Sequence, residues 1–309
     1  MARPPCHGAS DVTRPTTATF LVHAPDQPGL VARLAGFFYR LGLNIVEASN
    51  HTDAHVETGP RFFMRLVVDL AGLAAPAASE ALGGSATRGA LEAAFAGLVA
   101  EIGGGYRVGW SDVVQRVAIL CTKDPACVYD LVLRQRQGEL PCEIPLIISN
   151  HAHLESVAAS FRIPFFALPV TAATKREQEQ RVLELLRAHH VDLVVLARYM
   201  QVLSEELLDA APPVINIHHG FLPAFQGAKP YHQAHARGVK LIGATAHYAT
   251  RDLDEGPIIE QDVARVSHAM GPDDLVRVGR DVERVVLARA VRAHLEQRVV
   301  VEGRRTFLL

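Results

Sequence analysis

Apolar and polar positions alternate in two different rhythms along the chain, and the rhythm changes near residue 115. In the first third, two stretches repeat apolar residues at the spacing of one helix face, at 30–41 and 90–102. Short apolar runs that predict strands surround them, at 19–22, 44–49, 61–70 and 106–110. The resulting order, βαββαβ, predicts a small α+β sheet with its helices on one side.

Local signals mark the ends of the first predicted helix. The tetrapeptide Asp26-Gln-Pro-Gly29 precedes it, and Pro28 is expected in its first turn, where a missing N–H costs nothing. Gly42 is expected to end this helix. Residues 71–89 are rich in alanine, glycine and serine, so they are predicted to form a loop.

Beyond residue 115, short apolar runs alternate with helical stretches. The runs lie at 116–121, 143–149, 165–168, 191–197 and 213–217, and the helical stretches at 128–136, 152–161 and 176–188. Strands that are apolar on both faces and alternate with helices indicate a parallel, doubly wound α/β sheet. Further strands are expected at 241–248, 258–259 and 299–301, with a final helix at 272–297.

These patterns predict three segments. Residues 1–17, which are punctuated by prolines, are expected to be a disordered tail. Residues 18–112 are expected to form the small α+β domain, and residues 113–309 the doubly wound domain. A chain of 309 residues is long enough for two domains of ordinary size.

Composition narrows the possible partners and the cellular compartment. The net charge is -2, with 31 basic and 33 acidic residues, so the chain has no basic excess for binding a nucleic-acid backbone. The sequence contains no apolar run long enough to cross a bilayer, and its first residues have no apolar segment typical of a secretory signal. The four cysteines show no CxxC spacing, which favours reduced thiols and a cytoplasmic protein.

The strongest chemical signal follows the apolar run at 213–217. Asn216 and His218 are two positions apart on a predicted strand, so both should point to one side, whereas His219 should point away or begin a loop. Ligands of doubly wound sheets bind beyond the carboxyl ends of the strands. An amide and an imidazole there could stabilise an oxyanion, and one such donor lowers a barrier by about 3 kcal/mol. A carboxylate from the turn Asp252-Leu-Asp-Glu255 could keep His218 protonated and orient a water.

Structural and metal-binding interpretations compete with this one. A histidine near a strand end is usually a hydrogen-bonded structural residue, and Asp-Glu-Gly-Pro is by default a polar turn. Five histidines within thirty residues could suggest a metal site: His218, His219, His232, His235 and His247. The sequence has no HExxH motif and no cysteine joins the cluster, so a metal is not expected.

Two long strings resemble one enzyme family. NIHHGFLPAFQGAKPYHQA and GATAHYATRDLDEGPIIEQDV are similar to the corresponding segments of formyltetrahydrofolate deformylases, within the folate-dependent formyltransferases. The resemblance extends over 116–309. It implies a catalytic trio of Asn216, His218 and Asp254, and no metal or redox cofactor. It also implies that the loop around the pterin is formed by Arg198, Met200, Gln201, Val202 and Leu203.

The N-terminal part resembles an ACT domain, a small-ligand sensor module. Asp26-Gln-Pro-Gly29 and Gly42-Leu-Asn-Ile45 carry the likeness. It implies an amino-acid effector whose carboxylate meets helix N-terminal amides near Gly29, with Asp26 and Asn44 nearby. ACT-like sheets tend to pair, so a homo-oligomer is expected. In the alternative interpretation, Asp26 only caps the helix and Asn44 only turns the chain.

One turn bears on whether the formyl acceptor is water or an amine. Related transferases act on a phosphorylated amine, and phosphates are commonly held by a glycine-rich turn after a first strand. Here residues 121–127 contain no glycine, and Asp124 would repel an anion. We therefore predict hydrolysis of 10-formyltetrahydrofolate to formate and tetrahydrofolate. The alternatives are formyl transfer to an amine, or a non-catalytic folate or amino-acid sensor.

The sequence departs from the resembled family at one position beside the site. Gly220 follows the histidine pair where the family usually has serine, so we expect a more mobile loop there.

Overall fold

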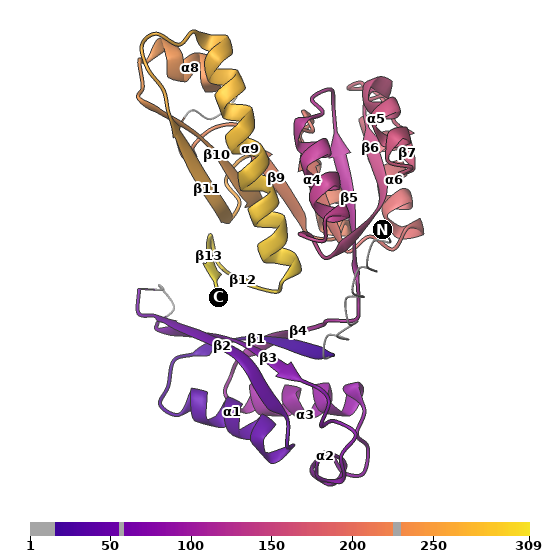
Figure 1. Cartoon of the computed structure of the whole chain (residues 1–309), viewed down its shortest axis with the longest axis vertical. Helices are drawn as coiled ribbons and strands as arrows, with labels where there is room; N and C mark the ends of the chain where they lie inside the picture. The colour runs from indigo at the N-terminus through magenta and orange to yellow at the C-terminus, as the bar shows by residue number, and fades with distance from the viewer. Residues whose placement is uncertain (1–15, 56–58, 225–229) are drawn as a thin grey trace, which may run out of the picture. The chain divides into compact units, whose positions relative to one another are not determined.

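The computed structural model describes residues 16–55, 59–224 and 230–309. These residues form two compact units, one comprising the chain up to Val113 together with Leu309, the other comprising Val114–Leu308. Each unit is described by itself (Figure 1). The predicted tail, 1–17, lies outside the described residues except for its last two, and Thr17 is already the first residue of a strand.

The first unit is a four-stranded sheet with helices on one face (Figure 1). Its elements are β1 (Thr17–Pro25), α1 (Leu30–Arg40), β2 (Asn44–Asp53), β3 (Arg61–Asp69), α2 (Pro76–Ala81), α3 (Arg88–Glu101) and β4 (Gly105–Trp110). The strands are ordered β2-β3-β1-β4, and every pair is antiparallel. Phe20 on β1 packs against Phe38 on α1 and Phe95 on α3, so the aromatic rings join the sheet to both helices. The predicted βαββαβ order is therefore confirmed.

Two local expectations in this unit were wrong. Pro28 is not in the first turn of α1, because Gly29 adopts φ 88° and the helix begins only at Leu30. This left-handed conformation is open to glycine but interrupts a helix. The predicted loop 71–89 contains α2, which begins with Pro76 at its first position, a placement that proline tolerates.

The second unit contains a seven-stranded, mostly parallel sheet. Its strands are β5 (Gln115–Cys121), β6 (Cys142–Ser149), β7 (Phe165–Ala167), β8 (Leu193–Ala197), β9 (Val214–His218), β10 (Leu241–Tyr248) and β11 (Ile258–Arg265). Their order is β11-β10-β9-β8-β5-β6-β7. The five strands from β9 to β7 are parallel, whereas β10 and β11 are antiparallel additions. A separate hairpin of β12 (Val299–Glu302) and β13 (Arg305–Leu308) ends the chain.

Helices cover both faces of this sheet. They are η1 (Ala152–Leu154), α4 (Ala126–Arg136), α5 (Glu155–Ser160), α6 (Lys175–Ala188), α7 (Glu205–Ala210), α8 (Pro230–Ala236) and α9 (Pro272–Leu295). One core joins α4, α5 and α9 to residues such as Val195 and Ile217. Another joins α6 and α7 to residues such as Val194 and Leu196. Successive residues of β8 thus enter opposite cores, which explains why its sequence is apolar throughout.

Three short elements of this unit were not predicted, and one of them, α7, has a local signal. Ser204 caps α7 by accepting a hydrogen bond from the Leu207 N–H, and Glu205 and Glu206 occupy its first turn. The other two elements are α8 and β13. Elements of four to seven residues contain too few repeats for hydrophobic periodicity to detect them.

The connections place the sheet's switch point between β5 and β8. From β5 the chain moves outward through β6 and β7, and from β8 it moves the other way to β9. The carboxyl ends of β5 and β8 pair directly, with Cys121 opposite Ala197. The residues that follow these strands, and those that follow β9, therefore lie at one edge of the sheet.

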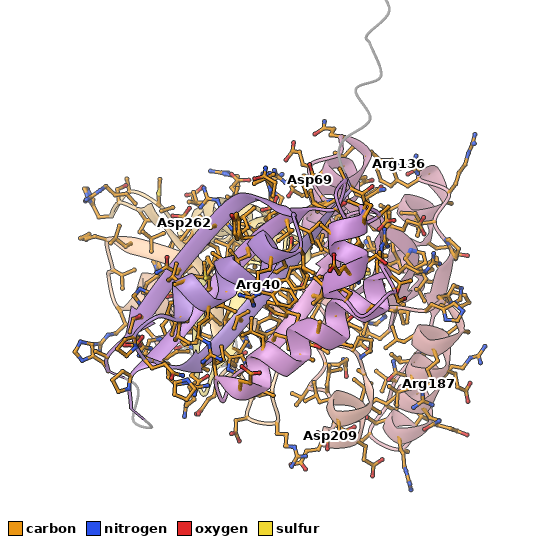
Figure 2. The ribbon with its side chains drawn as sticks, turned by 90° about the horizontal axis from the view of Figure 1, so that it is seen from below. Arg40, Asp69, Arg136, Arg187, Asp209 and Asp262 are labelled. Atoms are coloured by element: carbon orange, nitrogen blue, oxygen red, sulfur yellow. The ribbon has the colours of Figure 1, made fainter. Side chains whose placement is uncertain are left out.

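Charged side chains lie at the surface of this unit. Figure 2 shows Arg136, Arg187 and Asp209 projecting outward, and all three are exposed. Among the described residues, no helix is both long and apolar enough to cross a bilayer.

Two glycine-to-alanine changes should have opposite effects on stability. Alanine is the better helix former by about 1 kcal/mol. At Gly279 in α9, however, an added Cβ would lie 2.1 Å from the Tyr231 ring, and overpacking costs roughly 1–3 kcal/mol. At Gly97 in α3 the Cβ would meet nothing within 4 Å. We expect Gly279→Ala to lower the free energy of unfolding and Gly97→Ala to raise it, as measured by urea denaturation. A stabilising Gly279→Ala would contradict the packing around Tyr231.

Candidate active site

Asn216 and His218 lie on one face of β9, as predicted from their spacing. The antiparallel register of β9 and β10 places Asn216 opposite His247 and His218 opposite Thr245. Directly opposed residues point to the same face of a sheet. Four polar side chains therefore gather on one side of two central strands, while Ile215 and Ile217 point into the core on the other side.

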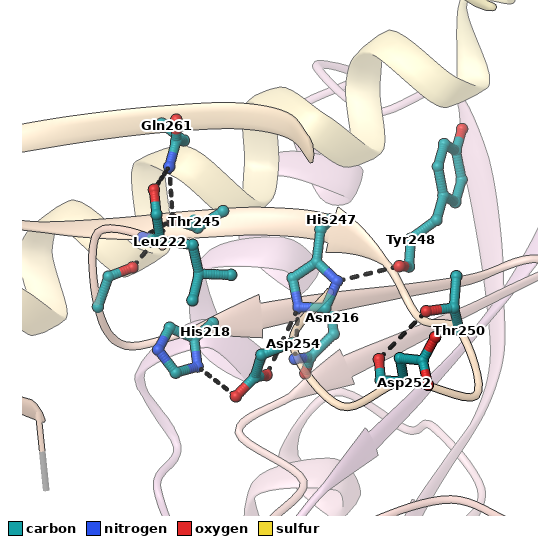
Figure 3. Close-up of polar contacts among 11 residues, drawn as sticks. Asn216, His218, Leu222, Thr245, His247, Tyr248, Thr250, Asp252, Asp254 and Gln261 are labelled. Carbon is teal, nitrogen blue, oxygen red and sulfur yellow. Dashed lines mark hydrogen bonds and ion pairs between the residues drawn. The ribbon is translucent and has the colours of Figure 1, made fainter. Parts of the chain in front are cut away.

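Asp254 comes from the loop that follows β10 and reaches back to this face. Its Oδ2 lies 3.2 Å from His218 Nδ1, and its Oδ1 lies 3.7 Å from His247 Nε2. Figure 3 shows the carboxylate between the two imidazoles. Its side chain is only 10% exposed. The structure therefore brings Asn216, His218 and Asp254 together, although about forty residues separate the strand from the loop.

Local backbone geometry sets the path of this loop. Asp254 has φ 59°, a left-handed conformation that Asp and Asn tolerate better than most residues. Two residues later, a Cβ on Gly256 would lie 1.7 Å from the Tyr248 carbonyl oxygen. Only glycine allows the loop to pass this close to the end of β10. The Asp-Glu-Gly turn thus determines where the carboxylate is held.

The carboxylate of Asp254 is held in its ionised form. Burial by itself raises the pKa of Asp254, but the hydrogen bond from His218 and the neighbouring imidazole of His247 outweigh it and lower the pKa below the usual range. On the other side of the His218 ring, Nε2 is buried and has no hydrogen-bond partner among the residues that the structure describes. A buried ring nitrogen without a partner is unfavourable unless a ligand completes it.

His247 links the other two polar groups, and the sequence had indicated it only as one of several possible metal ligands. Its Nδ1 donates to the Tyr248 carbonyl oxygen at 3.0 Å, because a carbonyl can only accept. Its Nε2 faces the Asn216 amide nitrogen at 3.2 Å and accepts a hydrogen bond from it. The orientation of the Asn216 amide is fixed by this contact. The pairing depends on strand register, which the sequence did not reveal.

The trio opens into a cavity of ≈ 300 Å³. The cavity is lined by all five residues predicted to surround a pterin, namely Arg198, Met200, Gln201, Val202 and Leu203. Met200 and Val202 are 55% and 54% exposed. Large apolar side chains that are exposed around a polar centre are typical of a ligand site. The loop at 249–254 forms the facing part of the lining.

Within the loop 198–203, Arg198 differs from its neighbours. Its guanidinium Nη1 donates to both carboxylate oxygens of Glu283, at 2.9 and 2.7 Å. Its backbone is left-handed, with φ 61°. Arg198 thus lines the cavity while its charge is committed to a residue on α9. Sequence reasoning did not identify Glu283.

The segment after His218 is joined to β10 and β11 by hydrogen bonds. The Thr245 hydroxyl donates to the Gly220 carbonyl oxygen at 2.9 Å and accepts from the Leu222 N–H at 3.0 Å. Gln261 donates to both Thr245 and Leu222 (Figure 3). β10 and β11 thus supply hydrogen bonds to Gly220 and Leu222, and the expectation of a more mobile loop stays a prediction. Residues 225–229 lie outside the described part of the chain.

The three predicted effector residues do not form one site within a single chain. Asp26 follows the end of β1 where Pro25, Arg61 and Asp53 are aligned. Asn44 is aligned with Asp69 at the opposite end of the sheet. At about 3.3 Å per residue, the two ends are about 25 Å apart. Asp26 does not cap α1 either: its carboxylate accepts from the Thr52 hydroxyl at 3.4 Å, and the helix has no side-chain cap at Gly29.

Within the ranges that the structure describes, no group of three or more His, Cys, Asp or Glu side chains could hold a metal ion. His232 and His235 lie on α8, which comes between β9 and β10 in the chain. Cys121, Cys127 and Cys142 are buried and free, and burial raises the pKa of the Cys121 thiol to about 12. None of these thiols is prepared for nucleophilic chemistry.

Comparison with known proteins defines the class of this chain. Residues 115–291, more than half of the chain, match the family model described as formyl transferase, and residues 18–77 match the ACT domain. A solved formyltetrahydrofolate deformylase from Pseudomonas syringae superposes with a TM-score of 0.88 at 41% identity, covering 96% of both chains. The chain is thus an ACT domain joined to a unit of the formyl transferase fold.

The particular family follows from relatives that match both units. A formyltetrahydrofolate deformylase from Synechocystis is 49% identical over 94% of this chain and 97% of its own length. Another from Bacillus subtilis is 43% identical over 93% of this chain and 92% of its own length. The chain belongs to the formyltetrahydrofolate deformylase family.

His219, the residue after His218, allows the electrostatics of the site to be tested through the pH dependence of stability. It is half-buried, and burial lowers its pKa from 6.5 to about 4, with the charges of Arg198 and His218 adding to the effect. His219 is therefore protonated below about pH 6.5 in the unfolded chain, but only below about pH 4 in the folded chain. We expect unfolding free energy to fall as pH decreases through this window, by roughly 3 kcal/mol at most from this group.

The check is urea denaturation of wild type and His219→Gln across that window. The variant should lose part of the slope, whereas His268→Gln, which changes an exposed histidine, should keep it. Equal slopes in wild type and His219→Gln would contradict the assignment of a neutral His219.

Proposed function

We propose that this protein hydrolyses 10-formyltetrahydrofolate to formate and tetrahydrofolate. The observation that carries the proposal is the convergence of an ionised carboxylate, an imidazole with a free buried nitrogen and a fixed amide at one cavity. The apolar part of the same cavity suits a flat heteroaromatic ring. The names of the relatives point to the same substrate.

The substrate is held on the side of the cavity formed by 198–203. Met200 and Val202 offer exposed apolar surface for the pterin, and the backbone of this loop can read its donors and acceptors. The formyl group then points toward β9, where Asn216 and His218 line the cavity.

Hydrolysis follows from the geometry of the trio. Asp254, ionised and partly enclosed, accepts a hydrogen bond from a water and directs the oxygen lone pair at the formyl carbon. As the tetrahedral intermediate forms, the oxyanion accepts hydrogen bonds from His218 Nε2–H, with the ring in its imidazolium form, and from the free N–H of Asn216. The bond between the formyl carbon and N10 breaks, N10 takes the proton that the water has lost, and formate leaves.

His247 supports catalysis by positioning the neighbouring polar groups. It accepts from Asn216 and approaches the second carboxylate oxygen of Asp254, so it keeps the amide and the carboxylate at a set separation. Its own Nδ1–H is fixed by the Tyr248 carbonyl oxygen. Catalytic groups need this kind of support to stay near productive geometry.

The proposed activity is tested by incubating the purified chain with 10-formyltetrahydrofolate and no acceptor. We expect one formate for each tetrahydrofolate released, measured by formate dehydrogenase coupling and absorbance. Formyl transfer to an amine as the true activity would give turnover only when an amine is added. A non-catalytic sensor would bind the folate without turnover. Either result would overturn the proposal.

The role of Asp254 is tested by Asp254→Asn. Asparagine tolerates the left-handed backbone at this position, so the loop should keep its path. Loss of the negative charge removes both the water-directing group and the partner of His218, and we expect kcat to fall about 100-fold or more with KM little changed. Steady-state kinetics of formate release measures this.

The matched control is Glu255→Gln. Glu255 is the next residue and makes an exposed ion pair with Arg304 at 2.9 Å. Exposed pairs contribute little, so this variant should retain wild-type kinetics. Normal hydrolysis by Asp254→Asn would require a different group to direct the water.

We also infer that the ACT unit binds a small-molecule effector, an amino acid in the form that its likeness implies, and that the chain forms a homo-oligomer. The separation of Asn44 from Asp26 means that one chain alone does not complete the predicted site. Repeating the formate assay with glycine or methionine examines this inference.

A further inference from the structure

The switch point between β5 and β8 is where a doubly wound sheet ordinarily receives a ligand. In this chain the position is filled by the protein's own side chains. Directly after the paired strand ends, the Met200 N–H donates to the Thr122 hydroxyl at 3.0 Å, joining the loop after β8 to the loop after β5. The Asp124 carboxylate pairs with Arg280 of α9 at 3.0 Å. The crevice is thus spanned by a hydrogen bond and an ion pair.

Arg198 and Glu283 occupy the space beside these contacts. The Glu283 side chain is only 1% exposed, and its two oxygens accept from Arg198 Nη1. The Tyr231 hydroxyl donates to the same carboxylate at 2.8 Å. The Tyr231 ring lies over Gly279, one helical turn before Glu283. A buried carboxylate without its cation would be strongly unfavourable, so Arg198 is held in place.

This cluster borders the reaction centre. Arg198, His218 and His219 line the same cavity. His219 lies between the two groups, with its ring centroid 5.5 Å from His218 and 6.1 Å from Tyr231. Arg198 therefore forms the wall of the cavity on the side of the switch point, opposite in the strand order to the Asp254 loop beyond β10, and its partners Glu283 and Tyr231 lie outside the lining.

We propose that Arg198, held by Glu283 and Tyr231, determines the acceptor: it fills the path by which an amine would reach the formyl carbon, so that only water attacks. This inference rests on the hydrolysis proposed above. It adds a reason, independent of the missing glycines at 121–127, why a unit of the formyl transferase fold acts as a hydrolase.

Removing Arg198 should convert part of the reaction to transfer. With the path open, the nitrogen of a primary amine attacks the formyl carbon and the carbon–N10 bond breaks. The amine loses one proton and N10 gains one, so the products are an N-formyl amine and tetrahydrofolate, with no oxidant or reductant needed. The freed Glu283 carboxylate would accept a hydrogen bond from the incoming amine.

Arg198→Gly is the direct variant, because its backbone already has φ 61°, where glycine is unstrained. Wild type and variant are incubated with 10-formyltetrahydrofolate and an excess of glycinamide. Formate is measured by enzymatic coupling and N-formylglycinamide by mass spectrometry. The expected result is formate alone from wild type, with N-formyl product at the background of the measurement, and N-formyl product about tenfold or more above that background in the variant.

The matched control is Arg162→Gly, the same change at a left-handed, exposed residue with φ 57°. It should give wild-type product ratios. Arg198→Gly/Glu283→Gln removes both buried charges, so it tests the inference if the single variant does not fold. It should also produce N-formylglycinamide, because the path is open in both variants.

The outcomes separate the two proposals. A folded Arg198 variant that cleaves the folate but yields only formate overturns this inference and leaves the hydrolase proposal standing. Transfer to glycinamide by wild type likewise overturns it. Wild type that releases no formate without glycinamide overturns the hydrolase proposal, and this inference falls with it.

Discussion

The arrangement of the site depends on one buried carboxylate held between two imidazoles. Asp254 lies within 3.2 Å of His218 and 3.7 Å of His247, and the histidines come from adjacent antiparallel strands. Burial alone would neutralise the carboxyl group, whereas the two imidazoles keep its pKa low. The same contacts hold the His218 ring at the cavity with its second nitrogen unpaired within the described ranges of the chain. The orientation and the charge of the site therefore have a common origin.

A second buried carboxylate, Glu283, differs from Asp254 because its partner, Arg198, carries a permanent charge. Its cation, Arg198, donates to both oxygens, and the Tyr231 hydroxyl completes the shell. Nothing is left for a ligand, so the group acts as structure. Asp254 instead lines an open cavity, where a ligand can reach it. Asp254 and Arg198, the partner of Glu283, line one cavity, and the proposals above give the first carboxylate a chemical role and the second a steric role.

Much of the architecture was predictable because each strand and long helix carries its own periodicity. Strands that enter two cores are apolar throughout, as in Leu193–Ala197, and the half-exposed helices repeat every three or four residues. The short elements α2, α7 and α8 could not be recognised in this way. At the site, the two-residue spacing of Asn216 and His218 gave their common face, and family resemblance singled out Asp254 from an acidic turn. His247, Glu283 and the aligned ends of β5 and β8 could not be identified because they depend on strand register and helix packing.

By itself, then, the sequence determined which residues are buried, which strands alternate with helices, and which polar groups lie at a strand end. These are properties of neighbours along the chain. Only the tertiary structure decided that His247 faces Asn216, that Gly256 lets the loop return to β10, and that Asn44 lies far from Asp26. Such facts depend on register: shifting a strand by one residue would turn every side chain to the opposite face while leaving its hydrophobic composition unchanged.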